Sequence, residues 1–226
     1  LIFCFTMRNH MEKSTLFKLE KPQLAKVFIT VLHLVGLMGL YWEKSRPLFQ
    51  LITPFHLLLV TSILLFFHSD FNKAFYGFSL FAFLVGMITE IIGVNTGLLF
   101  GDYSYGDVLG IKMFGVPLMI GVNWFLLVYL TGGIFQKMIK NDLIASALGA
   151  FLMVLLDLSL EIVAIALDFW EWHQESIPLS NYITWFLVAF IIQIVYRKSS
   201  FEKENALILV LFFNTSVDFI KDTKSL

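Results

Sequence analysis

The sequence predicts an all-α fold, a polytopic transmembrane helical bundle of about seven helices. Its 226 residues are 58% hydrophobic and only 15% charged, whereas about 25% of the residues in a soluble domain are charged. The apolar residues gather into stretches that approach or exceed the roughly 17 residues needed to cross a bilayer. The connections are mostly short, and no internal repeat stands out. We therefore expect a single integral membrane domain over residues 1–226, embedded in the lipid bilayer.

Seven apolar stretches define the expected helices. The first, third, fourth and fifth are long enough for a complete span, and a proline near the start of the fourth suits the first turn of a helix. The second and sixth are close to the minimum length. The seventh has only about 15 residues, so it is expected to be short, tilted or partly re-entrant. In chain order the predicted helices are Leu24–Trp42, Leu51–Phe67, Ala74–Gly93, Gly115–Phe135, Leu143–Leu167, Ser180–Tyr196 and Ala206–Ile220.

The lysines and arginines are divided unevenly between the two ends of these helices. Eleven fall on the side of the N-terminus and of the loops after the second, fourth and sixth spans, and five fall on the opposite side. Cytoplasmic loops of membrane proteins carry the excess of positive charge. We therefore expect residues 1–23 to be a cytoplasmic N-terminal segment, residues 24–220 to form the helical bundle, and the protein to lie in the cytoplasmic membrane.

The composition argues against several classes of function. The net charge of −1 argues against nucleic-acid binding, and the one cysteine, Cys4, excludes disulfide frameworks and cysteine metal clusters. No glycine-rich phosphate loop follows a strand pattern, so no nucleotide cofactor is indicated. The histidines lack the clustered spacing of a membrane di-iron centre. The sequence therefore predicts neither a metal nor another cofactor. The five histidines are His10, His33, His56, His68 and His173.

Carboxyl groups within the apolar stretches are the strongest indication of a functional site. Glu90 lies near the outer end of the third predicted helix, and Asp157 and Glu161 lie in the middle and outer part of the fifth. The spacing of four residues places Asp157 and Glu161 on one helix face. Asn123 lies two turns into the fourth helix. Ionisable residues within a membrane are rare and usually face the interior of the bundle.

These carboxyl groups have no obvious cation, because no lysine or arginine lies in the central parts of the predicted spans. Burial without a cation favours the protonated carboxyl group, and a neutral carboxylic acid at pH 7 can be a strong general acid. The groups could alternatively serve only as hydrogen bonds between helices. A functional site is the favoured interpretation, because all three are biased to the same half of the bilayer.

Two loops on the side with few positive charges are unusual in composition. The first, Val94–Phe114, is rich in glycine and tyrosine, and Thr96, Tyr103 and Tyr105 offer hydroxyl groups beside apolar surfaces. The second, Asp168–Leu179, contains a Trp-Glu-Trp sequence and no lysine or arginine. The tryptophans could form an aromatic belt at the membrane interface. Similarly, Asn181 near the start of the sixth predicted helix could act only as a helix cap.

An ordered set of motifs resembles the carotenoid biosynthesis membrane family that includes carotenoid 1,2-hydratases of the CruF type. The resemblance extends roughly from Gly86 to Phe186, and its departure from the family pattern lies in Gln174-Glu-Ser-Ile177. The matching motifs are Glu90-x-x-Gly93-x-x-Thr96-Gly97-x-x-Phe100-Gly101-x-Tyr103-x-Tyr105, Leu109-Gly110, Gly115-Val116-Pro117, Asn123-Trp124, Asp157-Leu-x-Leu-Glu161, Trp170-x-Trp172, Pro178-Leu-Ser-Asn181 and Trp185-Phe186.

The resemblance implies addition of water across the terminal C1–C2 double bond of an acyclic carotenoid end, such as that of γ-carotene or lycopene, as in haloarchaeal relatives that form bacterioruberin. A desolvated carboxyl group could supply the proton and aromatic faces could shield the cation. We expect Asp157 or Glu161 to donate the proton and Glu90 and Asn123 to organise water. The residues expected to bind the substrate are Thr96, Tyr103, Tyr105, Trp124, Asn181 and Trp185.

Three other interpretations remain open at the level of the sequence. A membrane prenyltransferase also uses acidic motifs, but it normally needs several aspartates with basic partners to bind a magnesium diphosphate. A transporter could use the same carboxyl groups as a proton relay, although the paired repeats of such folds are not found here. A non-catalytic scaffold is the third alternative. In the favoured interpretation the partners are the carotenoid substrate, the lipid bilayer and other enzymes of carotenoid biosynthesis.

Overall fold

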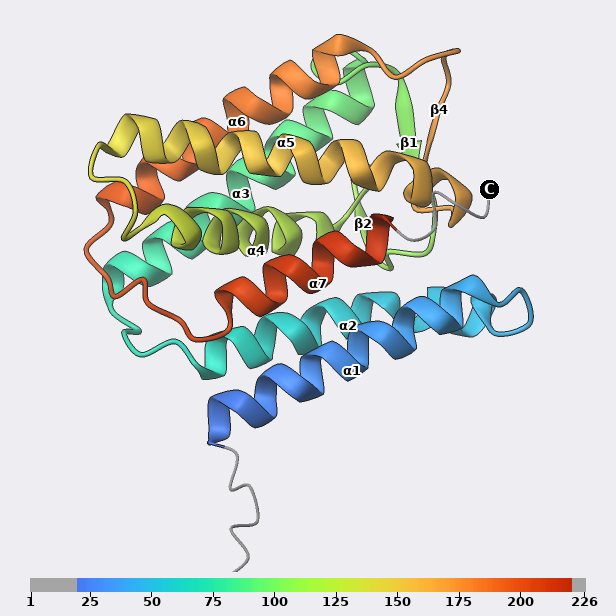
Figure 1. Cartoon of the computed structure of the whole chain (residues 1–226). Coiled ribbons are helices and arrows are strands. Elements are labelled where there is room, and N and C mark those ends of the chain that lie inside the picture. The colour runs from blue at the N-terminus through green and yellow to red at the C-terminus, as the bar shows by residue number, and fades with distance from the viewer. Residues whose placement is uncertain (1–19, 221–226) are drawn as a thin grey trace, which may run out of the picture.

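The computed structural model describes residues 20–220, which form one helical bundle (Figure 1). Six of its helices are long and apolar enough to cross a membrane, so the predicted fold class is confirmed. The expected N-terminal segment 1–23 lies largely outside the described residues, and its last three residues already belong to the first helix. The helices are α1 (Lys21–Tyr41), α2 (Arg46–Phe66), α3 (Lys73–Thr96), α4 (Leu118–Phe135), α5 (Asp142–Ala166), α6 (Leu179–Lys198) and α7 (Ile208–Ile220).

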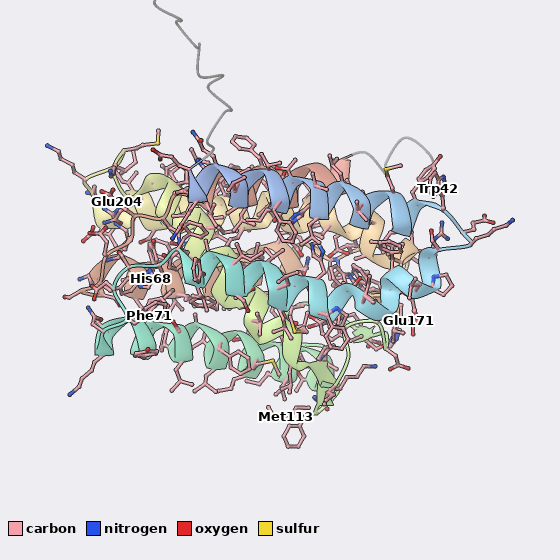
Figure 2. All side chains as sticks on the ribbon, turned by 90° about the horizontal axis from the view of Figure 1, so that it is seen from below. Trp42, His68, Phe71, Met113, Glu171 and Glu204 are labelled. Carbon is pink, nitrogen blue, oxygen red and sulfur yellow. The ribbon has the colours of Figure 1, made fainter. Side chains whose placement is uncertain are left out.

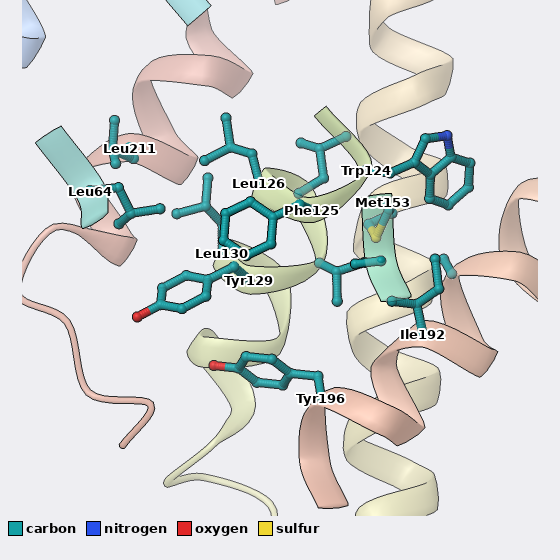
Figure 3. Close-up of a cluster of buried hydrophobic side chains, with 14 of the residues drawn as sticks. Leu64, Trp124, Phe125, Leu126, Tyr129, Leu130, Met153, Ile192, Tyr196 and Leu211 are labelled. Carbon is teal, nitrogen blue, oxygen red and sulfur yellow. The ribbon is translucent and has the colours of Figure 1, made fainter. Parts of the chain in front are cut away.

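Helix α4 lies at the centre of the bundle, packed against α3, α5 and α6 on one side and against α2 and α7 on the other. Because it is apolar on all sides, it suits a fully surrounded position. Glycines allow close packing here: Gly121 faces the Phe83 and Met87 side chains, and Gly132 faces Gln193 and Tyr196. Figure 3 shows the large side chains that fill the resulting core, among them Tyr129 and Tyr196.

The α1–α2 hairpin lies along one side of the bundle (Figure 1), and α7 contacts α1, α4 and α5. Leucine, valine and phenylalanine side chains on α1 and α2 are largely exposed, as expected for helices that face lipid. Helix α7 spans 13 residues and is not among the six candidate spans. The expectation that the seventh stretch is short therefore agrees with the structure.

Four short strands within residues 20–220 were not predicted from the sequence. They form two antiparallel ribbons, in which β1 (Tyr103–Tyr105) pairs with β4 (Trp170–Trp172) and β2 (Lys112–Met113) pairs with β3 (Val116–Pro117). The predicted helix Gly115–Phe135 therefore begins too early. Pro117 has the extended backbone angles φ −61° and ψ 137°, and helix α4 begins only after it. The β1–β4 ribbon joins two loops that are far apart in the sequence.

The two ends of the bundle differ in character. Figure 2 shows His68, Phe71 and Glu204 at one end and Trp42 and Glu171 at the other. The first end carries the α4–α5 and α6–α7 connections and most of the lysines and arginines of the described residues. The second end carries both ribbons. Most of the positive charge of the described residues therefore lies at the end opposite the ribbons.

Arg197 fastens the α4–α5 turn to the end of α6. Its guanidinium group, almost fully buried, donates to the Gln136 and Ile139 carbonyl oxygens at 3.2 and 2.9 Å and to Asp142 Oδ1 at 3.1 Å. Arg197→Ala leaves these acceptors without a partner, so we expect the free energy of unfolding to fall by about 2 kcal/mol. Thermal unfolding in detergent measures the loss. The exposed neighbouring change Lys198→Ala is the control, and equal melting temperatures for the two variants would contradict this role.

Candidate active site

A small cavity lies beneath the β1–β4 ribbon, where the C-terminal ends of α3 and α5 meet the N-terminal parts of α4 and α6. Its free volume of about 60 Å³ is enough for a few water molecules. Nine of the ten residues that the sequence singled out line this cavity. These residues are Glu90, Tyr103, Tyr105, Asn123, Trp124, Asp157, Glu161, Asn181 and Trp185.

Glu90, on α3, accepts three hydrogen bonds. Its Oε2 atom accepts from the hydroxyl groups of Tyr103 at 2.5 Å and Tyr105 at 2.8 Å, and its Oε1 atom accepts from Trp124 Nε1 at 3.1 Å. The carboxyl group is buried, with 2% of the residue exposed. Three donors and no acceptor around a carboxyl group match the hydrogen-bonding pattern of its ionised form.

The two tyrosines reach Glu90 because side chains at alternate positions of β1 lie on one face of the strand. Burial, together with the adjacent Glu90 carboxyl group, raises the pKa of Tyr103 far above its ordinary value. The same two causes raise the pKa of Tyr105. Both hydroxyl groups therefore stay protonated and act as donors toward Glu90.

Glu161, near the end of α5, is held by the other strand of the ribbon. Its Oε2 atom accepts from the indole nitrogens of Trp170 and Trp172, each at 3.0 Å. Its Oε1 atom accepts a longer bond, 3.4 Å, from Asn181 Nδ2. Each strand of the ribbon thus donates two hydrogen bonds to one glutamate.

Asp157 lies one turn before Glu161 and differs from both glutamates in its contacts. Its Oδ2 atom accepts one hydrogen bond, at 3.0 Å from Asn181 Nδ2, and its Oδ1 atom has no hydrogen-bond partner within residues 20–220. The residue is 2% exposed. Of the three carboxyl groups, Asp157 is therefore the one with an oxygen left free toward the cavity.

Asn123 and two tryptophans complete the lining on the α4 and α6 sides. The Asn123 amide has no hydrogen-bond partner in the described part of the chain, although it lines the cavity. The rings of Trp124 and Trp185 are stacked, with centroids 4.4 Å apart and planes at 19°. Gly86 on α3 lies so close to Trp124 that a Cβ atom there would overlap the indole.

Thr96 is the one predicted site residue that does not line the cavity. It is exposed, and its hydroxyl group donates to the Ile92 carbonyl oxygen of its own helix at 2.6 Å. Conversely, Trp170 and Trp172 line the cavity, although their sequence pattern, which is also compatible with an interfacial belt, does not place them among the expected site residues. Asn181 is not a helix cap, because Pro178 occupies the N-cap position of α6 and the Asn181 amide binds the two α5 carboxyl groups.

The bundle and the cavity define a class: a polytopic membrane protein with a buried site built from carboxyl groups and aromatic donors. The family model described as carotenoid biosynthesis protein matches residues 51–220, which include every residue of the cavity. The chain belongs to the carotenoid biosynthesis protein family, as the sequence motifs indicated. Neither a curated protein nor a solved structure matches it.

Proposed function

We propose that the protein is a cofactor-independent hydratase that adds water to the terminal C1–C2 double bond of an acyclic carotenoid end. The observation that carries this proposal is the unequal hydrogen bonding of three carboxyl groups around one cavity. Glu90 and Glu161 each accept three hydrogen bonds, whereas Asp157 accepts one. Membership of the carotenoid biosynthesis family supports the choice of substrate class.

Asp157 is the proton donor in this proposal. Hydration of a trisubstituted alkene begins with protonation of C2, which leaves a tertiary cation at C1. An acid for this step needs a carboxyl oxygen that carries a proton and faces the substrate. Asp157 Oδ1 has no protein partner among residues 20–220 and is available for that proton. Each carboxyl oxygen of Glu90 and Glu161, in contrast, already accepts at least one hydrogen bond from the protein.

Glu90 and Glu161 stabilise the cation through their negative charge. A carboxylate surrounded by fixed donors keeps its position while charge develops, which is the requirement for electrostatic stabilisation of a transition state. The aromatic faces of Trp124 and Trp185 add to this effect, because the face of an indole ring attracts a cation. The tyrosines and tryptophans of the ribbon hold the two carboxylates in place.

Asn123 orients the water that captures the cation. Its amide has no hydrogen-bond partner in the part of the chain that the structure describes, and the cavity has room for a few water molecules beside it. The water oxygen forms a bond to C1 and releases one proton. Asp157, ionised by the first step, accepts that proton and regains its starting form. The reaction therefore adds H to C2 and OH to C1 without any change of oxidation state in the protein.

The distribution of charge supports a location for this chemistry in the outer half of the membrane. Most of the lysines and arginines of the described residues lie at the end opposite the cavity, and the positive-inside rule assigns that end to the cytoplasm. In this orientation the acyclic carotenoid end reaches the cavity from the bilayer, and the β1–β4 ribbon separates the carboxyl groups from the outer aqueous phase.

Membranes containing the protein, incubated with lycopene or γ-carotene in ¹⁸O-labelled water, test the proposal. We expect a product heavier than the substrate by one labelled water per reacted end, with the oxygen at C1. Membranes from cells without the gene provide the control. Unchanged pigment in the presence of folded protein would exclude the hydratase, and a product with unlabelled oxygen would exclude water as the nucleophile.

A further inference from the structure

The β1–β4 ribbon has two chemically different faces. Side chains alternate along a strand, and the aromatic residues at the alternate positions bind the two glutamates of the cavity. The residues between and beside them form a polar cluster with its own hydrogen bonds, which we call the outer network. It consists of Asp102, Ser104, Glu171 and His173.

His173 is the centre of the outer network. Its Nδ1 atom lies 3.1 Å from Asp102 Oδ1, and its Nε2 atom lies 3.0 Å from Ser104 Oγ and 3.7 Å from Glu171 Oε1. The His173 backbone N–H donates to the Asp102 carbonyl oxygen at 3.0 Å. Because Asp102 precedes β1 and His173 follows β4, the imidazole ties the two strands together just beyond their paired residues.

The order of hydroxyl, imidazole and carboxylate matches that of a serine hydrolase, but the surroundings do not favour acyl transfer. Ser104 Oγ also lies 3.3 Å from Glu171 Oε1. A carboxylate at this distance opposes the negative charge that develops on the oxygen of an acyl substrate. A structural role for His173 in holding the ribbon accounts for both carboxylates, because Asp102 contacts one nitrogen of the imidazole and Glu171 contacts the other.

We propose that His173 is a positioning residue that fastens the ribbon over the cavity, and that a protonated imidazole fastens it more tightly than a neutral one. Histidine changes its charge between about pH 5 and 8, and Asp102 and Glu171 are the charged groups in contact with its ring among residues 20–220. At the other end of the ribbon Lys112 binds Asp107 and the Tyr105 carbonyl oxygen, away from the imidazole.

The consequence for catalysis rests on the proposed function. The strands that His173 joins present Tyr103 and Tyr105 to Glu90, and Trp170 and Trp172 to Glu161. A looser ribbon would weaken the positioning of both carboxylates without removing any group that touches the substrate. His173 is therefore expected to affect turnover through the ribbon and to give it a dependence on pH.

Hydrogen–deuterium exchange of the full-length protein in lipid nanodiscs measures the ribbon without any substrate. After correction for intrinsic exchange, we expect the β4 amides to exchange roughly threefold more slowly at about pH 5 than at about pH 8. His173→Gln retains a hydrogen-bonding side chain that cannot become charged, so the difference should disappear. Glu175→Gln, an exposed change next to the network, should preserve it.

A pH difference that persists in His173→Gln would overturn the proposal, as would equal exchange at both pH values in the unmodified protein. In the hydration assay, His173→Gln should flatten the pH profile of kcat while Glu175→Gln keeps it. Failure of the chain to hydrate any carotenoid would remove the proposed function and leave the exchange result standing, so the two ideas are tested separately.

Discussion

Asp157→Asn is expected to lower the rate of carotenoid hydration by at least about a hundredfold, the usual contribution of a positioned general acid. Asparagine has nearly the same shape as aspartate, and its side-chain oxygen can still accept the hydrogen bond from Asn181. The substitution removes the acidic proton and little else. Conversion of lycopene or γ-carotene by membranes with equal amounts of each protein measures the effect.

Asp142→Asn provides the matched control, because it makes the same change at the start of the same helix, far from the cavity, and the asparagine oxygen can still accept the hydrogen bond from Arg197. We expect its hydration rate to stay within about twofold of the unmodified protein, as is usual for exposed substitutions outside a site. If Asp157→Asn also hydrated the carotenoid within about twofold of the unmodified rate, Asp157 would not be the proton donor. A melting temperature of Asp157→Asn close to that of the unmodified protein is needed to assign its loss of activity to chemistry.

Gly86→Ala has the second large expected effect. A methyl group at this position would overlap the indole of Trp124, which donates to Glu90 at 3.1 Å. Forcing extra volume into a packed contact costs about 1–3 kcal/mol. Losing a hydrogen bond to a charged group costs about 1.5–3 kcal/mol. We therefore expect a clear fall in melting temperature together with a loss of hydration of about tenfold or more.

Gly77→Ala is the control for this experiment, because the same substitution on the same helix meets no atom within 4 Å. It should leave turnover nearly unchanged and should not lower the melting temperature, because alanine favours a helix more than glycine does. If Gly86→Ala proved as stable and active as Gly77→Ala, the close packing of α3 against Trp124 would have no role in positioning Glu90. If Gly86→Ala lowered the melting temperature but kept the full hydration rate, this packing would stabilise the fold without affecting the site.

The carboxyl groups of the site could be predicted because an ionisable residue stands out in an apolar stretch. The spacing of four residues predicts that Asp157 and Glu161 lie on the same face of a helix. The same reasoning shows why Thr96 does not line the cavity together with Glu90. Thr96 follows Glu90 by six positions, and at 3.6 residues per turn this rotates it well away from the face that carries Glu90. Proximity in the sequence was a poor guide at that position.

The ribbon could not be predicted because its strands are three residues long and lie in separate loops. Tyr-Ser-Tyr and Trp-Glu-Trp alternate as strands do, but such short patterns also occur in ordinary interfacial loops. The sequence alone does not show that Trp170 and Trp172 turn back toward Glu161. That arrangement depends on the pairing of β1 with β4, a contact between residues far apart in the chain.

The crowding of indole rings around the carboxyl groups has a spectroscopic consequence. The sequence holds five tryptophans, and Trp124, Trp170, Trp172 and Trp185 all line the cavity, while Trp42 lies exposed in the α1–α2 turn. Most of the tryptophans that emit under ultraviolet excitation therefore lie at the cavity. A conjugated polyene whose end group enters the cavity would lie beside four of these emitters, and energy transfer to it would report its binding without any added label.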